Sequence, residues 1–86
     1  MTVCWIDGAP ADSLPVKDRG LAYGDGLFET LLVKSGQPLL FEPHLQRLAL
    51  GGRRLALNLD LPLIERECRA VSVQMNEGVK KLIITR

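Results

Sequence analysis

A glycine pair, Gly24 and Gly26, followed at once by a mostly apolar run from Leu27 to Lys34, constrains the fold of this chain more than any other feature. Two glycines one residue apart predict a tight bend with a positive φ angle at one or both of them. The short apolar run after the bend predicts a strand. Phe28 and Thr30 share one face of that strand, because side chains alternate between its faces.

Turn residues divide the rest of the chain into further elements. Val3 to Ile6 predicts a short strand, which Asp7-Gly8 turns back as a hairpin. Ser35-Gly36-Gln37 predicts a turn into another strand, from Pro38 to Phe41. Val79 to Arg86 predicts a last strand, and its continuous apolar centre indicates that it is buried.

Two helices are expected between these strands. Pro43 fits the first position of one helix, where its missing N–H costs nothing, and Asp60 fits the N-cap of the next. The residues expected to form the apolar stripes of the two helices are Leu45, Leu48, Gly52 and Leu55, and then Ile64, Cys68, Val71 and Met75. The order of elements predicts an α+β fold, a small two-layer domain with two helices on one face of a mainly antiparallel sheet.

Composition excludes several classes of function. The chain has 86 residues, which suits one small domain, and its net charge of +1 argues against nucleic acid or an anionic membrane as a partner. No apolar run is long enough to span a bilayer, so we expect a cytoplasmic protein. One histidine and two distant cysteines, Cys4 and Cys68, do not make a metal site. Gly24 and Gly26 do not begin a dinucleotide-binding loop, because Glu29 occupies the third glycine position and no helix follows.

Arg47 is the best candidate for binding an anion. It lies one turn into the first long helix, about a third of a revolution from the apolar stripe, so its side chain can reach out of the core. Arg54 makes the same flank of the helix basic. The alternative is an ordinary solvated basic face. His44 is expected to pack or cap in the first turn rather than to act in catalysis, because no serine or cysteine is placed beside it as a nucleophile.

Several motifs together resemble the fold-type IV pyridoxal-phosphate enzymes. In chain order they are Trp5-Ile6-Asp7-Gly8, Asp18-Arg19-Gly20, Tyr23-Gly24-Asp25-Gly26-Leu27-Phe28-Glu29-Thr30 and His44-Leu45-Gln46-Arg47-Leu48. The resemblance covers essentially the whole chain. Within the family, Phe28-Glu29-Thr30 and the terminal Lys81 to Arg86 look most like the aminodeoxychorismate lyases, and the branched-chain and D-amino-acid aminotransferases remain alternatives.

The resemblance implies a site as well as a fold. Arg47 would bind the phosphate of pyridoxal 5'-phosphate, while Phe28 and Thr30 would line the substrate pocket. The substrate would be a small molecule, 4-amino-4-deoxychorismate, which the lyases convert to 4-aminobenzoate and pyruvate for folate biosynthesis. Fold-type IV enzymes are typically homodimers, so the resemblance also implies a second copy as partner.

The resemblance implies that some parts of the enzyme lie elsewhere. The family's cofactor-linking lysine and the carboxylate that faces the pyridine nitrogen both fall downstream of Arg86, so no catalytic residue is expected in this chain. We therefore expect residues 1–86 to be the N-terminal small domain, without the cofactor-binding domain and inactive alone. An alternative of another class is a stand-alone binding module with no catalytic role.

Overall fold

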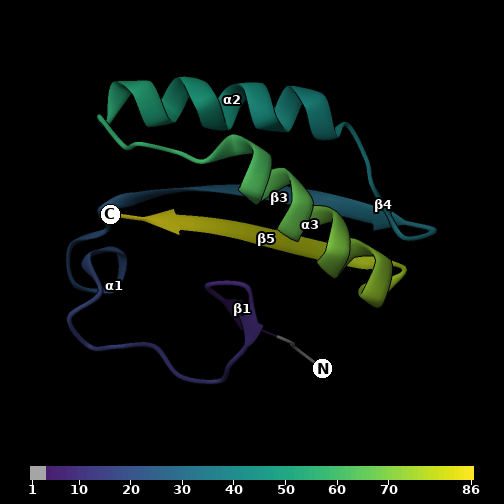
Figure 1. The fold of residues 1–86 in the computed structure, drawn as a ribbon, viewed down its shortest axis with the longest axis horizontal. Coiled ribbons are helices and arrows are strands. Elements are labelled where there is room, and N and C mark those ends of the chain that lie inside the picture. The colour runs from purple at the N-terminus through teal and green to yellow at the C-terminus, as the bar shows by residue number, and fades with distance from the viewer. Residues whose placement is uncertain (1–3) are drawn as a thin grey trace.

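A three-stranded antiparallel sheet with two helices on one face forms the body of the domain in the computed structural model, which describes residues 4–86 (Figure 1). The elements are β1 (Trp5–Ile6), β2 (Ala9–Pro10), α1 (Arg19–Tyr23), β3 (Gly26–Lys34), β4 (Gln37–Pro38), α2 (Phe41–Arg54), α3 (Leu61–Met75) and β5 (Gly78–Thr85). In the sheet the strand order is β4-β3-β5, and β1 with β2 forms a separate hairpin. The predicted α+β class is confirmed. Val3, predicted to begin the first strand, lies outside the described residues.

Strand β3 has one buried and one exposed face. Glu29, Leu31 and Val33 are buried, whereas the residues between them are exposed. Strand β5 runs antiparallel to β3, and its register is fixed from Gly26 opposite Thr85 to Val33 opposite Gly78. We call the exposed side of these two strands the outer face. It consists of Phe28, Thr30, Leu32 and Lys34 of β3 with Val79, Lys81, Ile83 and Thr85 of β5.

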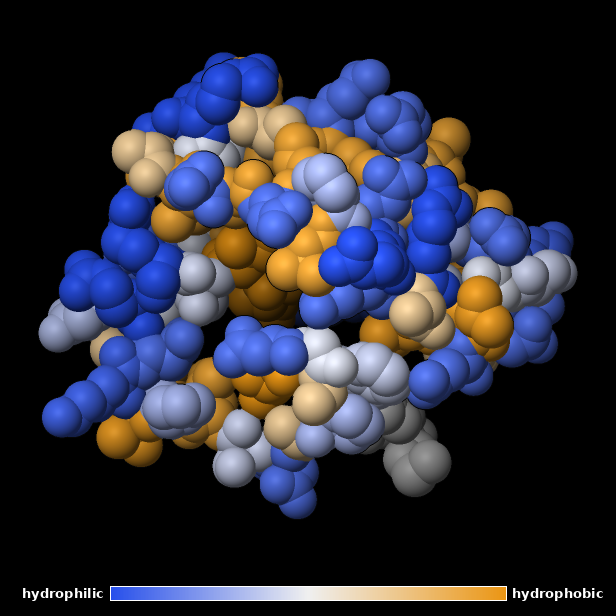
Figure 2. All heavy atoms as spheres, viewed as in Figure 1, coloured by the Kyte–Doolittle hydropathy of each residue, from blue (hydrophilic) through white to orange (hydrophobic). Residues whose placement is uncertain are grey.

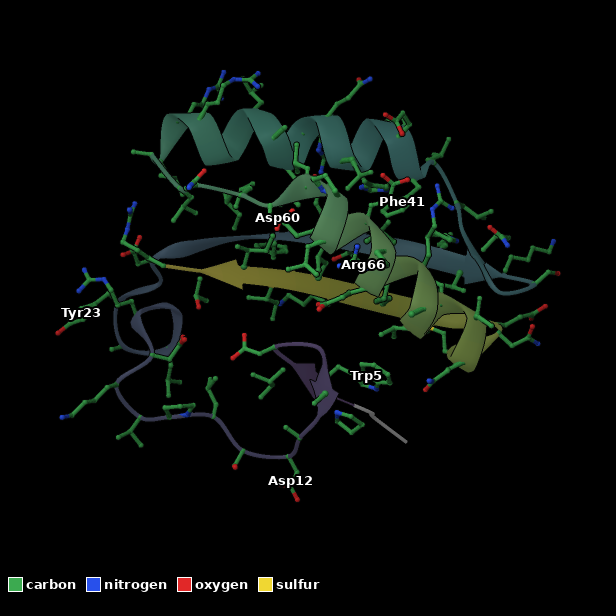
Figure 3. The ribbon with its side chains drawn as sticks, in the orientation of Figure 1. Trp5, Asp12, Tyr23, Phe41, Asp60 and Arg66 are labelled. Atoms are coloured by element: carbon green, nitrogen blue, oxygen red, sulfur yellow. The ribbon has the colours of Figure 1, made fainter. Side chains whose placement is uncertain are left out.

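The buried side of the sheet carries the core. Leu31 of β3 packs with side chains from both long helices, and these are Phe41, Leu45 and Cys68, with Ile64 and Leu82 at the margin. In Figure 1 α2 runs along β3, while α3 crosses in front of β5. Phe41, at the start of α2, lies close to α3 in Figure 3, and the guanidinium carbon of Arg69 lies 4.8 Å from its ring centroid. Both helices therefore cover the same face.

Each glycine of the pair is required for a different physical reason. Gly24 has φ 65°, which confirms the positive φ expected at the bend. Gly26 does not, but a Cβ atom there would collide with the backbone oxygen of Ile84 on the neighbouring strand. The pair thus ends α1 and lets β3 start in close contact with β5.

Helix starts were only partly predicted. Asp60 caps α3 as expected, because its side chain accepts a hydrogen bond from the backbone N–H of Leu63. The strand predicted from Pro38 to Phe41 is wrong beyond Pro38, since Leu40 adopts φ 53° and the helix begins at Phe41. Pro43 is therefore the third residue of α2 rather than the first.

The sequence pattern did not predict the short helix α1. Asp18 caps it by accepting from the backbone N–H of Leu21, and also accepts from the Thr85 hydroxyl. Tyr23, near the end of α1, points away from the body of the domain in Figure 3. The N-cap of α1 therefore connects this helix to β5, the last strand.

Charged side chains cover much of the helical side of the domain, with apolar ones visible between them (Figure 2). No helix in residues 4–86 is long and apolar enough to cross a membrane.

The bend at Asp25 is held by an ion cluster. Arg19 Nε lies 2.8 Å and Arg86 Nε 3.0 Å from Asp25 Oδ2. Arg86 also donates to the backbone oxygens of Leu55 and Ala56, at the end of α2. The cluster therefore joins α1, the bend, the end of β5 and the end of α2.

This cluster predicts an acid-sensitive contribution to stability. The hydrogen bond from Arg19, with the positive charge of Arg86, holds the pKa of Asp25 below its ordinary value of 3.8. Because the pKa is lower in the folded chain, the contribution is complete above about pH 4 and is lost as the pH falls through the folded-state pKa. Asp25→Asn should reduce the decline in the free energy of urea unfolding below about pH 4.

The exposed Asp12 offers a matched control for this measurement. Asp12→Asn should keep the wild-type dependence on pH. An Asp25→Asn protein whose stability still falls as steeply as the wild type would show that the cluster does not supply the acid sensitivity.

Candidate functional site

Glu29 is a buried acid on the helix-covered face of β3, only 5% exposed. Its Oε1 accepts from Arg47 Nε at 3.1 Å, and its Oε2 accepts from Arg47 Nη2 at 2.8 Å. His44 Nδ1 lies 3.2 Å from the same Oε2. The carboxylate therefore has a bidentate arginine and an imidazole as partners, which is the kind of surrounding that a buried charge requires.

The fold brings these residues together from two elements. His44 and Arg47 lie three positions apart in α2 and so share one side of that helix. Glu29 precedes Leu31 and Val33 on the inward phase of β3, so its side chain points toward α2. The polar group thus sits at one end of the core and fixes how α2 lies on the strand.

Arg47 keeps donors available for an anion. Its side chain is 73% exposed, and Glu29 takes up the N–H of Nε and one N–H of Nη2. An arginine has five N–H donors, so three remain. Because the bidentate bond holds the guanidinium plane, these donors are presented in one orientation. Arg47 therefore fits the phosphate-binding role predicted for it, and that role itself stays a prediction.

Phe28 and Thr30 lie on the outer face, opposite to Glu29, and both are exposed. The structure confirms that they share one face of the strand, but it does not bring them together with Arg47. Between the two lies an edge of β3 that no described strand covers before Val33, because β4 pairs only with Val33 and Lys34.

Sequence reasoning missed Glu29 and missed the pairing of His44. The available signal was the phase of β3, since an acid that alternates with Leu31 and Val33 must be buried with them. A buried carboxylate needs cationic partners, and the predicted helix offered His44 and Arg47 one turn apart.

Other regions of residues 4–86 offer weaker candidates. They contain no group of three or more His, Cys, Asp or Glu side chains arranged for a metal ion. A shallow cavity of about 210 Å³ lies at the end of α2, and its lining residues are Ala49, Arg53, Leu57, Asn58, Leu59 and Leu61. Arg53 is the one charged residue in that lining, which includes no general acid, general base or nucleophile. Of the two cysteines, Cys68 is buried in the core, whereas Cys4 is exposed.

Comparisons with known proteins agree with the geometry of the fold. The crystal structure of 4-amino-4-deoxychorismate lyase from Pseudomonas aeruginosa matches 95% of this chain with a TM-score of 0.93 and 56% identity. The pyridoxal-phosphate-bound form of a hypothetical aminotransferase from Mycobacterium tuberculosis matches 88% of it with a TM-score of 0.82 and 36% identity. A bifunctional aminodeoxychorismate lyase / D-amino acid transaminase of M. tuberculosis is 40% identical over 79 residues, 85% of this chain.

The chain spans only part of each of these proteins. It covers 30% of the P. aeruginosa structure, 29% of the aminotransferase structure and 27% of the bifunctional M. tuberculosis protein. No protein-family model matches it.

The buried ion group predicts a measurable loss of stability. Glu29→Gln keeps the size of the side chain but removes the charge that Arg47 and His44 surround, so it should lower the free energy of unfolding by about 1–3 kcal/mol. Urea denaturation measures this difference.

Glu42→Gln is the matched control, because Glu42 is an exposed acid in the first turn of α2. It should change stability by less than about 0.5 kcal/mol. Equal effects of the two substitutions would mean that the Glu29 pairing contributes nothing beyond ordinary surface charge.

Proposed function

We propose that this chain, which matches the N-terminal portion of the fold-type IV pyridoxal-phosphate enzymes in sequence and fold, belongs to a lyase that converts 4-amino-4-deoxychorismate to 4-aminobenzoate and pyruvate. The observation that carries the proposal is the higher identity and closer superposition with the P. aeruginosa lyase than with the aminotransferase structure. In this proposal, residues 1–86 are the small N-terminal domain, and the cofactor-binding domain belongs to the rest of the polypeptide.

The residues of this chain have binding roles in the proposal. Bound pyridoxal 5'-phosphate supplies the electron sink for the carbon that bears the amine. Arg47 donates its free N–H groups to the cofactor phosphate while Glu29 holds the guanidinium from behind. Phe28 and Thr30 line the substrate side of the pocket from the outer face. No catalytic residue is assigned to this chain.

An aminotransferase activity is the second candidate. The observation that favours it is the M. tuberculosis relative, whose name joins a lyase and a D-amino acid transaminase activity. Pyridoxal phosphate would supply the same electron sink to either reaction, and the two differ in whether the substrate loses its enolpyruvyl group or gives up its amine. Residues 1–86 contribute the same binding groups to either outcome.

The proposal includes a setting for the enzyme. It is cytoplasmic and acts as a homodimer on a small-molecule substrate, as typical fold-type IV enzymes do. The end of the outer face away from Phe28 supports burial against other protein, because Leu32 and Val79 leave two large apolar side chains exposed there.

A product assay tests the reaction. The intact polypeptide, loaded with pyridoxal phosphate, should form 4-aminobenzoate and pyruvate in equal amounts from 4-amino-4-deoxychorismate, and light scattering should give the mass of a dimer. Exchange of amino groups between amino acids and keto acids, with no 4-aminobenzoate, would replace the lyase by an aminotransferase. Absence of both reactions would favour a non-catalytic module.

Arg47 gives a separate test of the cofactor site. Arg47→Ala in the intact polypeptide should weaken binding of pyridoxal phosphate by about 10- to 100-fold, because a charge-assisted phosphate contact contributes about 1.5–3 kcal/mol. Equilibrium dialysis measures the affinity. Arg54→Ala, on the same helix and also exposed, should leave it unchanged. Full retention of the cofactor by Arg47→Ala would contradict the phosphate role.

A further inference from the structure

The outer face has an unusual balance of charge and apolar surface. Its large apolar side chains are exposed, with Phe28 at 63% and Ile83 at 60%. Its charged residues are Lys34 and Lys81, and the one carboxylate bonded to it is that of Asp18, which accepts from the Thr85 hydroxyl at one end of the face. The surface around Phe28 and Lys81 is apolar and cationic, and such a surface complements a ligand that is cyclic or aromatic and anionic.

Lys81 lies at the centre of this surface. It is opposite Thr30 in the β3–β5 register, and Phe28 is opposite Ile83 on the same face. The Lys81 ammonium lies 4.7 Å from the centroid of the Phe28 ring. Within residues 4–86, Lys81 forms none of the ion pairs that hold the other charged clusters. A cation, an aromatic ring and a hydroxyl are thus neighbours on an open face.

The neighbouring lysine shows that this placement is specific. Lys80 points to the opposite side of the sheet, where its amine donates to the Cys68 backbone oxygen at 2.7 Å and to the Ser72 hydroxyl at 2.6 Å. Lys80 is therefore occupied in holding α3 to β5. Lys81 has no such internal role, and its ammonium is available to a ligand.

We propose that Lys81 is a specificity residue that binds a carboxylate of the substrate, while the ring of the substrate lies against Phe28. The proposal rests on the lyase function proposed above. The substrate is a six-membered ring with a carboxylate on it, and the product 4-aminobenzoate keeps that ring carboxylate. Phe28 supplies apolar contact for the ring, Thr30 supplies a hydroxyl, and Lys81 supplies the one centrally placed positive charge on this face.

The simpler interpretation is that the Lys81 ammonium only makes a cation–π contact with the Phe28 ring. A cation–π contact at an exposed site is weak, and it would give Lys81 a small effect on stability and none on ligand selectivity. The two readings therefore differ in whether Lys81 distinguishes a ligand with a carboxylate from one without it.

The test is ligand discrimination in the intact polypeptide. Wild type should bind 4-aminobenzoate at least about 10-fold more tightly than aniline, which has the same ring and amine without the carboxylate. Lys81→Met should lose most of this preference, and Lys81→Arg should keep most of it. In the lyase assay, Lys81→Met should raise KM for 4-amino-4-deoxychorismate by about the same factor. The affinity for pyridoxal phosphate should not change.

Lys34→Met is the matched control, because Lys34 carries the same charge on the same face at the far end of β3. It should leave the preference for 4-aminobenzoate intact. An unchanged preference in Lys81→Met, or an equal loss in Lys34→Met, would overturn the proposal. If the wild type makes 4-aminobenzoate but Lys81→Met changes neither the ligand preference nor KM, this inference fails while the lyase function stands. A wild type that neither makes nor binds 4-aminobenzoate contradicts both.

Discussion

The pairing of buried Glu29 with Arg47 and His44 is the interaction on which the site depends. An isolated buried carboxylate is costly, so its position on the inner side of β3 requires α2 to present cationic groups there. That requirement sets how α2 lies against the strand. It also turns Arg47 so that one side of the guanidinium meets Glu29 and the other meets solvent. The same contact that stabilises the layer therefore orients the group assigned to the phosphate.

Side chains alternate between the two faces along β3 and β5, so the two sides of the sheet have different roles. Glu29 and Lys80 face the helices, where each is bound by side chains or backbone of α2 or α3. Phe28 and Lys81 are their sequence neighbours and face the other way, where they stay exposed. The side chains that hold the layers together and those proposed to bind a ligand thus alternate along two short strands.

The features that the sequence predicted correctly are set by residues close together in the chain. The strand after the glycine pair, the positive φ at Gly24 and the cap at Asp60 each depend on residues within a few positions, and all are present. The predicted start of α2 was wrong, because no residue pattern around Leu40 indicates its left-handed backbone conformation. The Glu29 group and the contact of Arg86 with the end of α2 were not foreseen, since each joins residues far apart in the chain.

The most direct test of the central claim is a crystal structure of the intact polypeptide with pyridoxal phosphate bound. We expect Arg47 to keep Nε and Nη2 on Glu29 while its remaining N–H groups, including those of Nη1, donate to phosphate oxygens. A phosphate held without Arg47, or an Arg47 side chain that has turned away from Glu29 to reach it, would contradict the claim that the buried carboxylate positions the cofactor-binding arginine.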